Sequence, residues 1–506
     1  MEIHRDSEPK SERPLFKAAQ DLAREISELE PNPEYATNAP CALIVGGYVR
    51  DSLLGLNPKD ADIEVYGVAP DELKALLKKK FGQVEIVGEA FAVLKVSLGD
   101  GLELDVSIPR RESKTGKGHK DFAVIADPSM TIQEAAQRRD FTVNALAMDP
   151  VTGVIFDPFG GQEDIKNRIL RVTDSERFQD DPLRVLRAMQ FVARLEFTID
   201  LESAQLMQEM VSRGELDHLP RERVTTELEK LLVKAKRPSV GFEFGRTIGV
   251  IERHFPELHA LIDVPQEPEW HPEGDVWIHT MMVVDAAAKI ARRDGFSESD
   301  RRPIVLGALA HDFGKPATTE TIDGRIRSLG HEEAGEAPTR EMCKRLSFGG
   351  DDVEAVVAIA KMHLQPGMLY RALETGKITD KAYVNAVRKV VKRLGKTSWR
   401  ILLAASEADF RGRTIPGVDT APYTPGLTFA KTVIDHGLDK EALKPLMQGR
   451  DLITEFGLVP SKTNGPLFGR IISAVEAARD EGKIETREQA IELARNMLLV
   501  VSKVEL

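Results

Sequence analysis

The sequence predicts an α+β protein in which a small head of alternating strands and helices precedes a long helical body. Between about residues 40 and 150, short apolar runs alternate with helix-like segments, whereas after residue 150 the spacing of apolar residues is mostly helical. At 506 residues the chain is too long for one hydrophobic core. We therefore expect a polar N-terminal extension (1–38), the head (39–150), a helical neck (151–265), a histidine-rich helical domain (266–412) and a helical tail (413–506).

The composition is that of an ordinary globular protein, with 42% hydrophobic and 30% charged residues. No apolar run approaches the ~20 residues that a membrane span needs, and the polar N-terminus does not resemble a signal peptide. The two cysteines, Cys41 and Cys343, are far apart and are expected to be structural thiols in a reducing compartment. We therefore expect a cytoplasmic protein that does not enter a membrane. The net charge of −12 argues against nonspecific coating of nucleic acid but allows local basic surfaces.

The head begins with the apolar run CALIV, which predicts a strand, and a glycine pair then opens the helix-like segment 48–55. Residues 61–68 alternate as a strand, and residues 70–82 predict a helix with proline at its start and glycine at its end. Residues 91–98 and 102–108 predict two strands joined by the turn Gly-Asp-Gly.

Three carboxylates of the head point to a metal site. Asp60 and Asp62 are two residues apart at the mouth of a predicted strand, and a period of two places both side chains on one face. Asp105 can add a third carboxylate from a neighbouring strand. Oxygen ligands suit Mg²⁺, and metals held in this way activate a hydroxyl and neutralise a triphosphate during in-line displacement.

A phosphate cradle is predicted just upstream. Gly46 and Gly47 follow a strand, and Arg50 lies in the first turn of the helix that they open. Backbone N–H groups at a helix N-terminus face an anion, and arginine adds a bidentate donor.

Five stretches resemble the head and neck of bacterial class II tRNA nucleotidyltransferases and poly(A) polymerases of the polymerase-β superfamily. They occur along the chain in the same order as in that family. They are VGGYVRDSLLGLNPKDADIEVYG (45–67), RRDFTVNALAMD (138–149), DPFGGQEDIKNRILRV (157–172), DDPLRVLRAMQFVAR (180–194) and LPRERVTTELEKLL (219–232). The resemblance implies a polymerase-β-like nucleotidyltransferase head followed by an elongated all-helical neck.

The resemblance also implies a role for each matching residue. Asp60, Asp62 and Asp105 would form the catalytic Mg²⁺ site, and the remaining matches would bind the nucleotide: Gly46, Gly47, Arg50, Arg139, Asp140, Asn144, Asp181, Arg184 and Arg187. Asp181 and Arg184 are three apart on the predicted neck helix, which places them on one face. A carboxylate accepts from an exocyclic amine and a guanidinium donates to a ring nitrogen or carbonyl, so this pair would select C and A over U and G.

The basic stretch 110–122 corresponds to the flexible loop of this family, which goes with the change from adding C to adding A. Its cations Arg110, Arg111, Lys114 and Lys117 are expected to follow RNA or triphosphate. The acidic lead-in usual before the Arg139 motif is EAAQ here, which leaves Glu134 as a candidate substitute.

Histidines are concentrated between residues 266 and 412, where the series H…HD…D occurs. This series resembles the HD phosphohydrolase domain fused to some bacterial CCA-adding enzymes. The resemblance implies one metal bound by His279, His311, Asp312 and Asp409, and it leaves His331 and His363 for a second metal or the scissile phosphate. Imidazole with carboxylate suits Ni, Mn, Co, Fe or Zn. Lys315 can hold phosphate, and the implied chemistry is that of a phosphatase, 2′-nucleotidase or 2′,3′-cyclic phosphodiesterase.

The function implied by these motifs is addition or repair of the tRNA 3′-terminal CCA from CTP and ATP, with phosphohydrolase activity beside it. An A-adding-only enzyme and a poly(A) polymerase share the head motifs and stay as alternatives. An HD phosphohydrolase whose head only binds RNA is the alternative of another class. The sequence does not choose between a monomer and a homodimer, or between RNA contact and dimerisation for the tail.

Overall fold

The computed structural model describes residues 14–35, 39–87, 93–114, 122–439, 445–459, 465–480 and 483–504. The chain divides into two compact units, Met1–Pro256 and Glu257–Leu506, which are treated separately below. Lys117 and the side chain of Lys114 lie outside the described residues, so their predicted part in the flexible loop stays a prediction.

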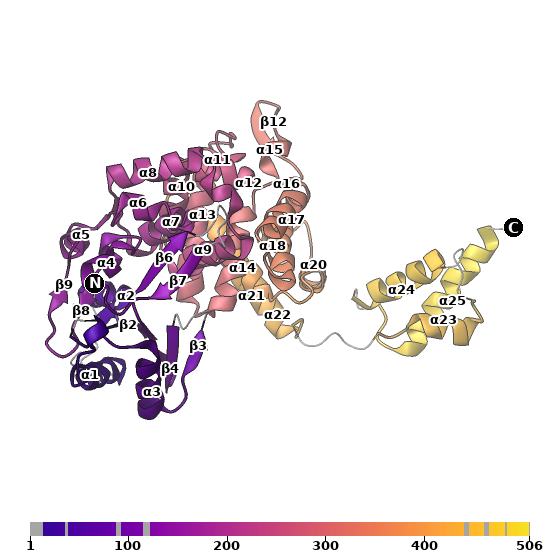
Figure 1. The fold of residues 1–506 in the computed structure, drawn as a ribbon. Helices are drawn as coiled ribbons and strands as arrows, with labels where there is room; N and C mark the ends of the chain where they lie inside the picture. The colour runs from indigo at the N-terminus through magenta and orange to yellow at the C-terminus, as the bar shows by residue number, and fades with distance from the viewer. Residues whose placement is uncertain are drawn as a thin grey trace. The chain divides into compact units, whose positions relative to one another are not determined.

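The head of the first unit is built on a seven-stranded sheet of order β3-β4-β5-β2-β1-β8-β9 (Figure 1). Its strands are β1 (Cys41–Val45), β2 (Asp60–Tyr66), β3 (Glu85–Val87), β4 (Val93–Gly99), β5 (Leu102–Ser107), β8 (Ala147–Met148) and β9 (Ile155–Phe156). The hairpin β6 (Arg110–Lys114) and β7 (Phe122–Ala126) forms a separate ribbon, and β10 (Ile169–Leu170) pairs with β11 (Thr198–Ile199). The predicted strands and the helix α3 (Pro70–Phe81) are present, while β3 was not predicted because three residues carry too little pattern.

Apolar residues hold the site-bearing strand in the middle of this sheet. The strand β2 pairs antiparallel with β1 and parallel with β5, and it buries Ala61, Ile63 and Val65. Since side chains alternate along a strand, the acidic residues between them share the opposite face. The helices α1 (Pro14–Ser27) and α2 (Gly47–Leu53) contact the sheet.

The neck of the first unit is helical, as predicted from the spacing of apolar residues after residue 150. Its helices are α4 (Ile132–Gln137), α5 (Gly161–Asn167), α6 (Ser175–Phe178), α7 (Leu183–Leu195), α8 (Leu201–Ser212), α9 (Arg221–Lys234), α10 (Pro238–Thr247) and α11 (Val250–His254). The helix α7 packs against both α9 and α10 and buries most of its length. A Cβ on Gly241 of α10 would lie 2.3 Å from Leu231 Cδ1 and 2.5 Å from the Met189 carbonyl oxygen.

This close approach gives a stability prediction. Gly241→Ala inserts a methyl group against backbone, so we expect it to lower the free energy of unfolding by roughly 1–3 kcal/mol, the usual cost of overpacking. Urea denaturation followed by far-UV circular dichroism measures the change. Gly367→Ala is the control, because a Cβ there meets nothing within 4 Å and should be neutral or stabilising. Equal stability of both variants would show that α7 and α10 do not pack this closely.

The second unit is an assembly of helices with one small hairpin. Its helices are α12 (Pro256–His259, at the boundary), α13 (Val276–Arg293), α14 (Glu298–Ala310), α15 (Lys315–Thr318), α16 (His331–Ala334), α17 (Glu336–Arg345), α18 (Gly350–Met362), α19 (Gln365–Glu374), α20 (Asp380–Arg393), α21 (Trp399–Arg411) and α22 (Thr424–Asp435). The hairpin β12 (Thr319–Ile322) and β13 (Arg325–Ser328) was not predicted, although Asp323-Gly324 at its turn is a common hairpin signal.

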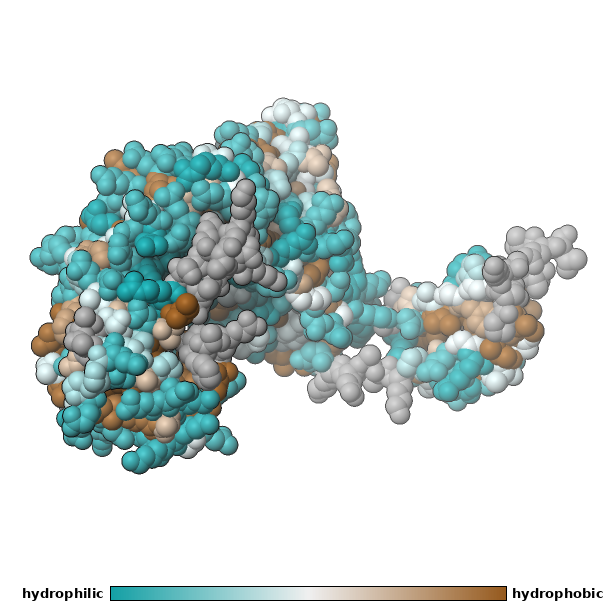
Figure 2. All heavy atoms as spheres, viewed as in Figure 1, coloured by the Kyte–Doolittle hydropathy of each residue, from teal (hydrophilic) through white to brown (hydrophobic). Residues whose placement is uncertain are grey.

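The tail consists of α23 (Gly449–Phe456), α24 (Gly465–Asp480) and α25 (Arg487–Val504). It has its own hydrophobic cluster, centred on Leu452, Ile471 and Val475. Figure 2 shows hydrophobic surface on the visible face of this part of the chain. The exposed apolar residues of the tail include Val459 and Leu499. Across the described ranges, we find no helix with the length and apolar character that a membrane crossing requires.

Candidate functional site

The three predicted carboxylates of the head meet on one face of the sheet. Asp60 and Asp62 lie on β2, and Asp105 lies directly beside Asp62 on the parallel strand β5. Oδ1 of Asp105 is buried without a hydrogen-bond partner among the described residues, and Lys95 Nζ lies 3.5 Å from it. Desolvation by the surrounding protein raises the pKa of Asp62, and the neighbouring carboxylates of Asp105 and Asp60 raise it further, while Arg139 opposes them. Mutual repulsion among these carboxylates, with an Asp105 oxygen that accepts no hydrogen bond from the described residues, fits a site for a hard divalent cation.

Glu64 extends this acidic face and was not singled out in the sequence. Its Oε1 accepts a hydrogen bond from Arg139 Nη2 at 2.9 Å, and its Oε2 accepts one from the Tyr66 hydroxyl at 2.9 Å. Arg139, which is predicted to bind the nucleotide, is thereby fixed next to the predicted metal-binding carboxylates. Continuing the period of two beyond Asp62 could have identified Glu64.

The predicted phosphate cradle has the expected backbone but a buried arginine. The helix α2 begins at Gly47, after Gly46 at φ 68°, a conformation that favours glycine. Arg50 is only 3% exposed; its Nε donates to Asp51 at 2.7 Å, and its Nη1 donates to Asn144. The structure therefore places the Arg50 guanidinium inside the protein, where it also lies 5.1 Å from the centre of the Phe191 ring.

Asp140 and Arg187, both predicted to bind nucleotide, bind each other. Asp140 Oδ2 accepts from Arg187 Nε at 2.7 Å, and its Oδ1 accepts from Asn144 Nδ2 at 2.8 Å. Burial would raise the pKa of Asp140, but Arg187 and the hydrogen bond from Asn144 hold it below its usual value. Asn144 belongs to the short 3₁₀ turn Thr142–Asn144, so these contacts connect the head with α7.

A cleft of about 710 Å³ joins Asp62, one of the three predicted carboxylates, to the predicted base-reading pair. Its lining includes the site residues Asp62, Arg110, Arg111, Arg139, Asp181 and Arg184 and, beyond those predicted to bind, Glu64, Glu134, Arg138, Arg177, Asp180 and Arg223. This volume lies within the roughly 300–1,000 Å³ range of small-molecule sites.

Asp181 and Arg184 face this cleft with different partners. The helix α7 begins at Leu183, so Asp181 precedes it rather than lying on it as predicted, because Pro182 starts the turn. Asp181 Oδ2 accepts from Arg223 at 2.8 Å, and Arg184 donates to the carbonyls of Arg177 and Arg138, both at 2.7 Å. Arg223 stands in the stretch 219–232 already noted, although the sequence did not connect it with Asp181.

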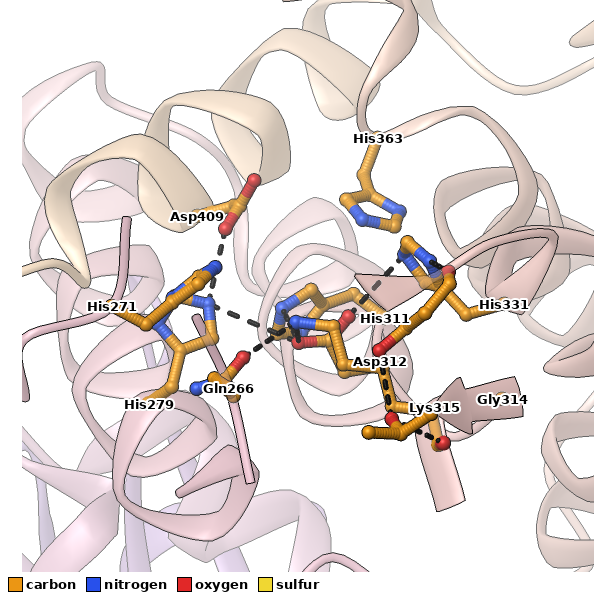
Figure 3. A network of polar contacts seen from close by, with 12 residues as sticks. Gln266, His271, His279, His311, Asp312, Gly314, Lys315, His331, His363 and Asp409 are labelled. Atoms are coloured by element: carbon orange, nitrogen blue, oxygen red, sulfur yellow. Dashed lines mark hydrogen bonds and ion pairs between the residues drawn. The ribbon is translucent and has the colours of Figure 1, made fainter. Parts of the chain in front are cut away.

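In the second unit, the predicted HD residues converge in one buried cluster (Figure 3). They come from separate elements: His279 from α13, His311 and Asp312 from the end of α14, His331 from α16, His363 from the end of α18 and Asp409 from α21. Every one of them is less than 9% exposed. His279 Nε2 lies 3.1 Å from Asp409 Oδ1 and 3.9 Å from Asp312 Oδ2.

Backbone carbonyls orient three of the imidazoles. The Nδ1 atoms of His311, His331 and His363 lie 2.7, 2.8 and 3.0 Å from the carbonyl oxygens of the residues three positions earlier. This leaves each Nε2 for a ligand, which is the arrangement typical of metal-binding histidines. The Nε2 atoms of His311 and His331 are buried without a hydrogen-bond partner in the described part of the chain, 3.1 and 3.5 Å from Asp312.

Asp312 belongs to two possible ligand groups. One consists of Asp312 with His279 and His311, and the other of Asp312 with His331 and His363, with ligand atoms within 4.8 Å in each group. Burial lowers the pKa of His363 to about 3, with a further contribution from His311, so its imidazole is neutral and able to bind a metal. Burial opposes ionisation of Asp312, but His311 and Lys315 hold its pKa well below the usual value. The donor set fits a transition metal.

Three further residues complete the site, and the sequence did not indicate them. Glu273 Oε1 lies 2.8 Å from His279 Nδ1 and 2.9 Å from His271 Nδ1. Arg413 contacts Asp409 at 3.2 Å, and Gln266 accepts from Lys315 Nζ at 2.7 Å. Lys315 Nζ also lies 2.7 Å from Asp312, so two cations, Lys315 and Arg413, stand beside the predicted ligands.

Sequence patterns of known domains match both parts of the chain. The poly A polymerase head domain matches residues 42–171, the probable RNA and SrmB-binding site of polymerase A matches residues 196–262, and the HD domain matches residues 276–394. Asp409 lies beyond the last of these segments.

Known proteins match over most of the chain. The multifunctional CCA protein of Stenotrophomonas maltophilia is 36% identical over 445 residues, covering 86% of this chain and 99% of that protein. The one from Cupriavidus metallidurans is 37% identical over 378 residues, covering 73% and 84%. Among solved structures, an apo CCA-adding enzyme matches with a TM-score of 0.58 and 21% identity, covering 94% of both chains. The CCA-adding enzyme of Bacillus stearothermophilus in complex with CTP matches with a TM-score of 0.55 and 21% identity, covering 97% of this chain and all of the other. The resemblance seen in the sequence is thus confirmed, and the chain belongs to the family of multifunctional CCA proteins.

Proposed function

We propose that this protein adds the terminal CCA to tRNA from CTP and ATP and hydrolyses phosphate esters in its HD domain. The observation that carries the first activity is the single cleft in which Asp62 lies with Asp181 and Arg184. The membership of the chain in a family whose relatives are named multifunctional CCA proteins supports it, as does a fold shared with CCA-adding enzymes solved with ATP, CTP and tRNA.

In the head, Asp60, Asp62 and Asp105 would hold Mg²⁺, which activates the RNA 3′ hydroxyl and neutralises the triphosphate when bound. Arg139, held by Glu64, contributes positive charge beside these carboxylates. Asp181 accepts from the exocyclic amine of C or A, and Arg184 donates to the adjacent acceptor. Arg50, Asp140, Asn144 and Arg187 would support this site by connecting α2 and the 3₁₀ turn to α7.

The experiment that tests this activity supplies the full protein with Mg²⁺, single or mixed labelled nucleotides, and tRNA that ends at the discriminator base. We expect two C and one A to be added and extension then to stop. Addition of A only, and only to tRNA ending in CC, would identify an A-adding enzyme. Long A tails would identify a poly(A) polymerase.

Base selection by Asp181 and Arg184 can be measured directly. Arg184→Ala removes the donor to the base, so we expect the preference for CTP and ATP over UTP and GTP to fall by about tenfold or more, since a good base contact contributes ~1–3 kcal/mol of discrimination. Single-nucleotide incorporation with each of the four triphosphates gives the ratio. Arg213→Ala is the control, because this exposed arginine pairs with Glu215 and is not part of the cleft. Unchanged selectivity in Arg184→Ala would remove the residue from base reading.

In the HD domain, we infer that two metals share Asp312, with His279, His311 and Asp409 on one and His331 and His363 on the other. A metal of the group Ni, Mn, Co, Fe and Zn supplies an activated water there when bound. Lys315 and Arg413 are placed to hold the phosphate. The reaction forms a bond from phosphorus to the water oxygen and breaks the bond to the ribose oxygen, which takes a proton. Metal-dependent release of phosphate from 2′-nucleotides, and opening of 2′,3′-cyclic nucleotides, test this activity.

The proposal also covers the role of the tail and the cellular compartment of the protein. A separate hydrophobic cluster supports a tail that folds as a module, for contact with tRNA or with a second copy of the chain. Sedimentation of the full chain with and without tRNA distinguishes a monomer from a dimer. With tRNA as substrate, the protein would act in the cytoplasm.

A further inference from the structure

A tryptophan stands at the mouth of the HD cavity. Trp270 is 40% exposed, whereas the predicted ligands Asp312, His331, His363 and Asp409 that line the same cavity are all buried. The lining of the cavity also includes Ile326 and Ser328 of β13. The cavity thus has a charged interior and an aromatic rim.

Two hydrogen bonds hold the loop that carries Trp270. Its backbone N–H donates to the carbonyl of Glu267 at 3.0 Å, and the Glu267 carboxylate accepts from the backbone N–H of Ile326 at 2.9 Å. The loop that carries Trp270 is therefore fastened to the hairpin that also lines the cavity. A rigid aromatic ring costs little conformational entropy when a planar group stacks on it.

The size of the cavity decides which part of a substrate enters it. Its volume is about 230 Å³. That is below the roughly 300–1,000 Å³ of sites that enclose a whole drug-sized ligand. A phosphate with its ribose can occupy such a space, next to Lys315 and Arg413, while the base must stay at the rim.

Trp270 is suited to receive that base. The guanidinium of Arg371 lies 5.4 Å from the centre of the indole ring and adds positive charge beside an aromatic surface that is still accessible. Bases stack on aromatic rings and on guanidinium planes, and this stacking is tolerant of base identity.

We propose that Trp270 stacks on the nucleobase of the phosphate ester that the HD site hydrolyses, so that the site takes nucleotide ends in preference to simple phosphate esters. This proposal rests on the phosphohydrolase activity proposed above and adds the residue that selects a nucleotide substrate. Trp270 acts here by positioning the substrate, since it does not contact the reacting atoms.

The hydrolysis test compares adenosine 2′-monophosphate with glycerol 2-phosphate, which carries no ring. Trp270→Ala should raise the KM for the nucleotide by about tenfold, the order of effect of base–aromatic stacking, and leave kcat nearly unchanged. The KM for glycerol 2-phosphate should not change, and Trp270→Phe should restore most of the nucleotide affinity. An equal loss on both substrates, or no loss on either, would overturn the stacking role while the phosphohydrolase activity stands.

A binding test separates this proposal from the activity itself. All three tryptophans, Trp270, Trp277 and Trp399, belong to the second unit, and Trp277 is fully buried. Adenosine 2′-monophosphate added to metal-stripped protein should quench the fluorescence of the wild type and of the matched control Trp399→Phe, but not that of Trp270→Phe. Absence of quenching in the wild type would overturn the proposal even if hydrolysis is found. Quenching without any hydrolysis would retain the base contact and remove the phosphohydrolase function.

Discussion

Asp62→Asn is expected to abolish the addition of both C and A, with a loss of about a thousandfold or more in kcat/KM, as for other groups that stabilise charge in a transition state. The carboxylate lies beside Asp105 and next to Asp60, and losing one of the three proposed ligands would leave Mg²⁺ without its site. Incorporation of labelled CTP and ATP into tRNA measures the loss. Hydrolysis by the HD domain should stay within about twofold, because the two sites belong to separate units and independent sites behave additively.

The stability of this variant provides a check on that interpretation. The pKa of Asp62 is raised in the folded protein, so its charged form is disfavoured there and its removal does not lower stability at neutral pH. Mg²⁺ should raise the Tm of the wild type and have little effect on that of the variant. Glu103→Gln is the matched control, since Glu103 is an exposed carboxylate on the same strand as Asp105. Normal CCA addition by Asp62→Asn would exclude Asp62 as a catalytic ligand. Absence of any nucleotide addition by the wild type would instead point to an HD phosphohydrolase whose head only binds RNA.

Asp312→Asn is expected to remove hydrolysis by the HD domain and most of its bound metal, because Asp312 is shared by both ligand groups. Metal analysis of the purified protein and phosphate release from 2′-nucleotides give the two readouts. CCA addition should continue, since the head lies in the other unit. A variant with full metal content and full hydrolysis would exclude Asp312 as a shared ligand.

Loss of Asp312 also leaves Lys315 buried without its partner carboxylate, which costs roughly 3–5 kcal/mol in typical buried pairs. The double variant Asp312→Asn with Lys315→Met removes both charges and is expected to recover much of this stability but no hydrolysis. Near-UV circular dichroism shows that each protein is folded. Asp435→Asn, at an exposed aspartate of the same unit, is the control for loss of one carboxylate.

How much of this structure the sequence predicts depends largely on how far apart along the chain the contacting residues are. The strand that carries Asp60 and Asp62, the helix α3 and the six HD residues follow from local pattern and motif, and the structure brings each set together. The surroundings of Arg50 and Asp140 do not follow from pattern, since Asn144 and Arg187 are distant in sequence and meet them only in the folded chain. Glu273 and Arg413 are close in sequence to His279 and Asp409, yet they were not found, because a motif names the ligands but not the residues that orient them.

The hydrogen bonds from Arg187 to Asp140 and from Arg194 to Asp51 join the neck helix α7 to the head. These contacts restrict the movement of α7 relative to the head. We therefore expect the nucleotide site to keep a nearly constant size while the product grows, so that each added residue must withdraw the RNA end by one step. The length of the added sequence is then limited by the room left for the RNA.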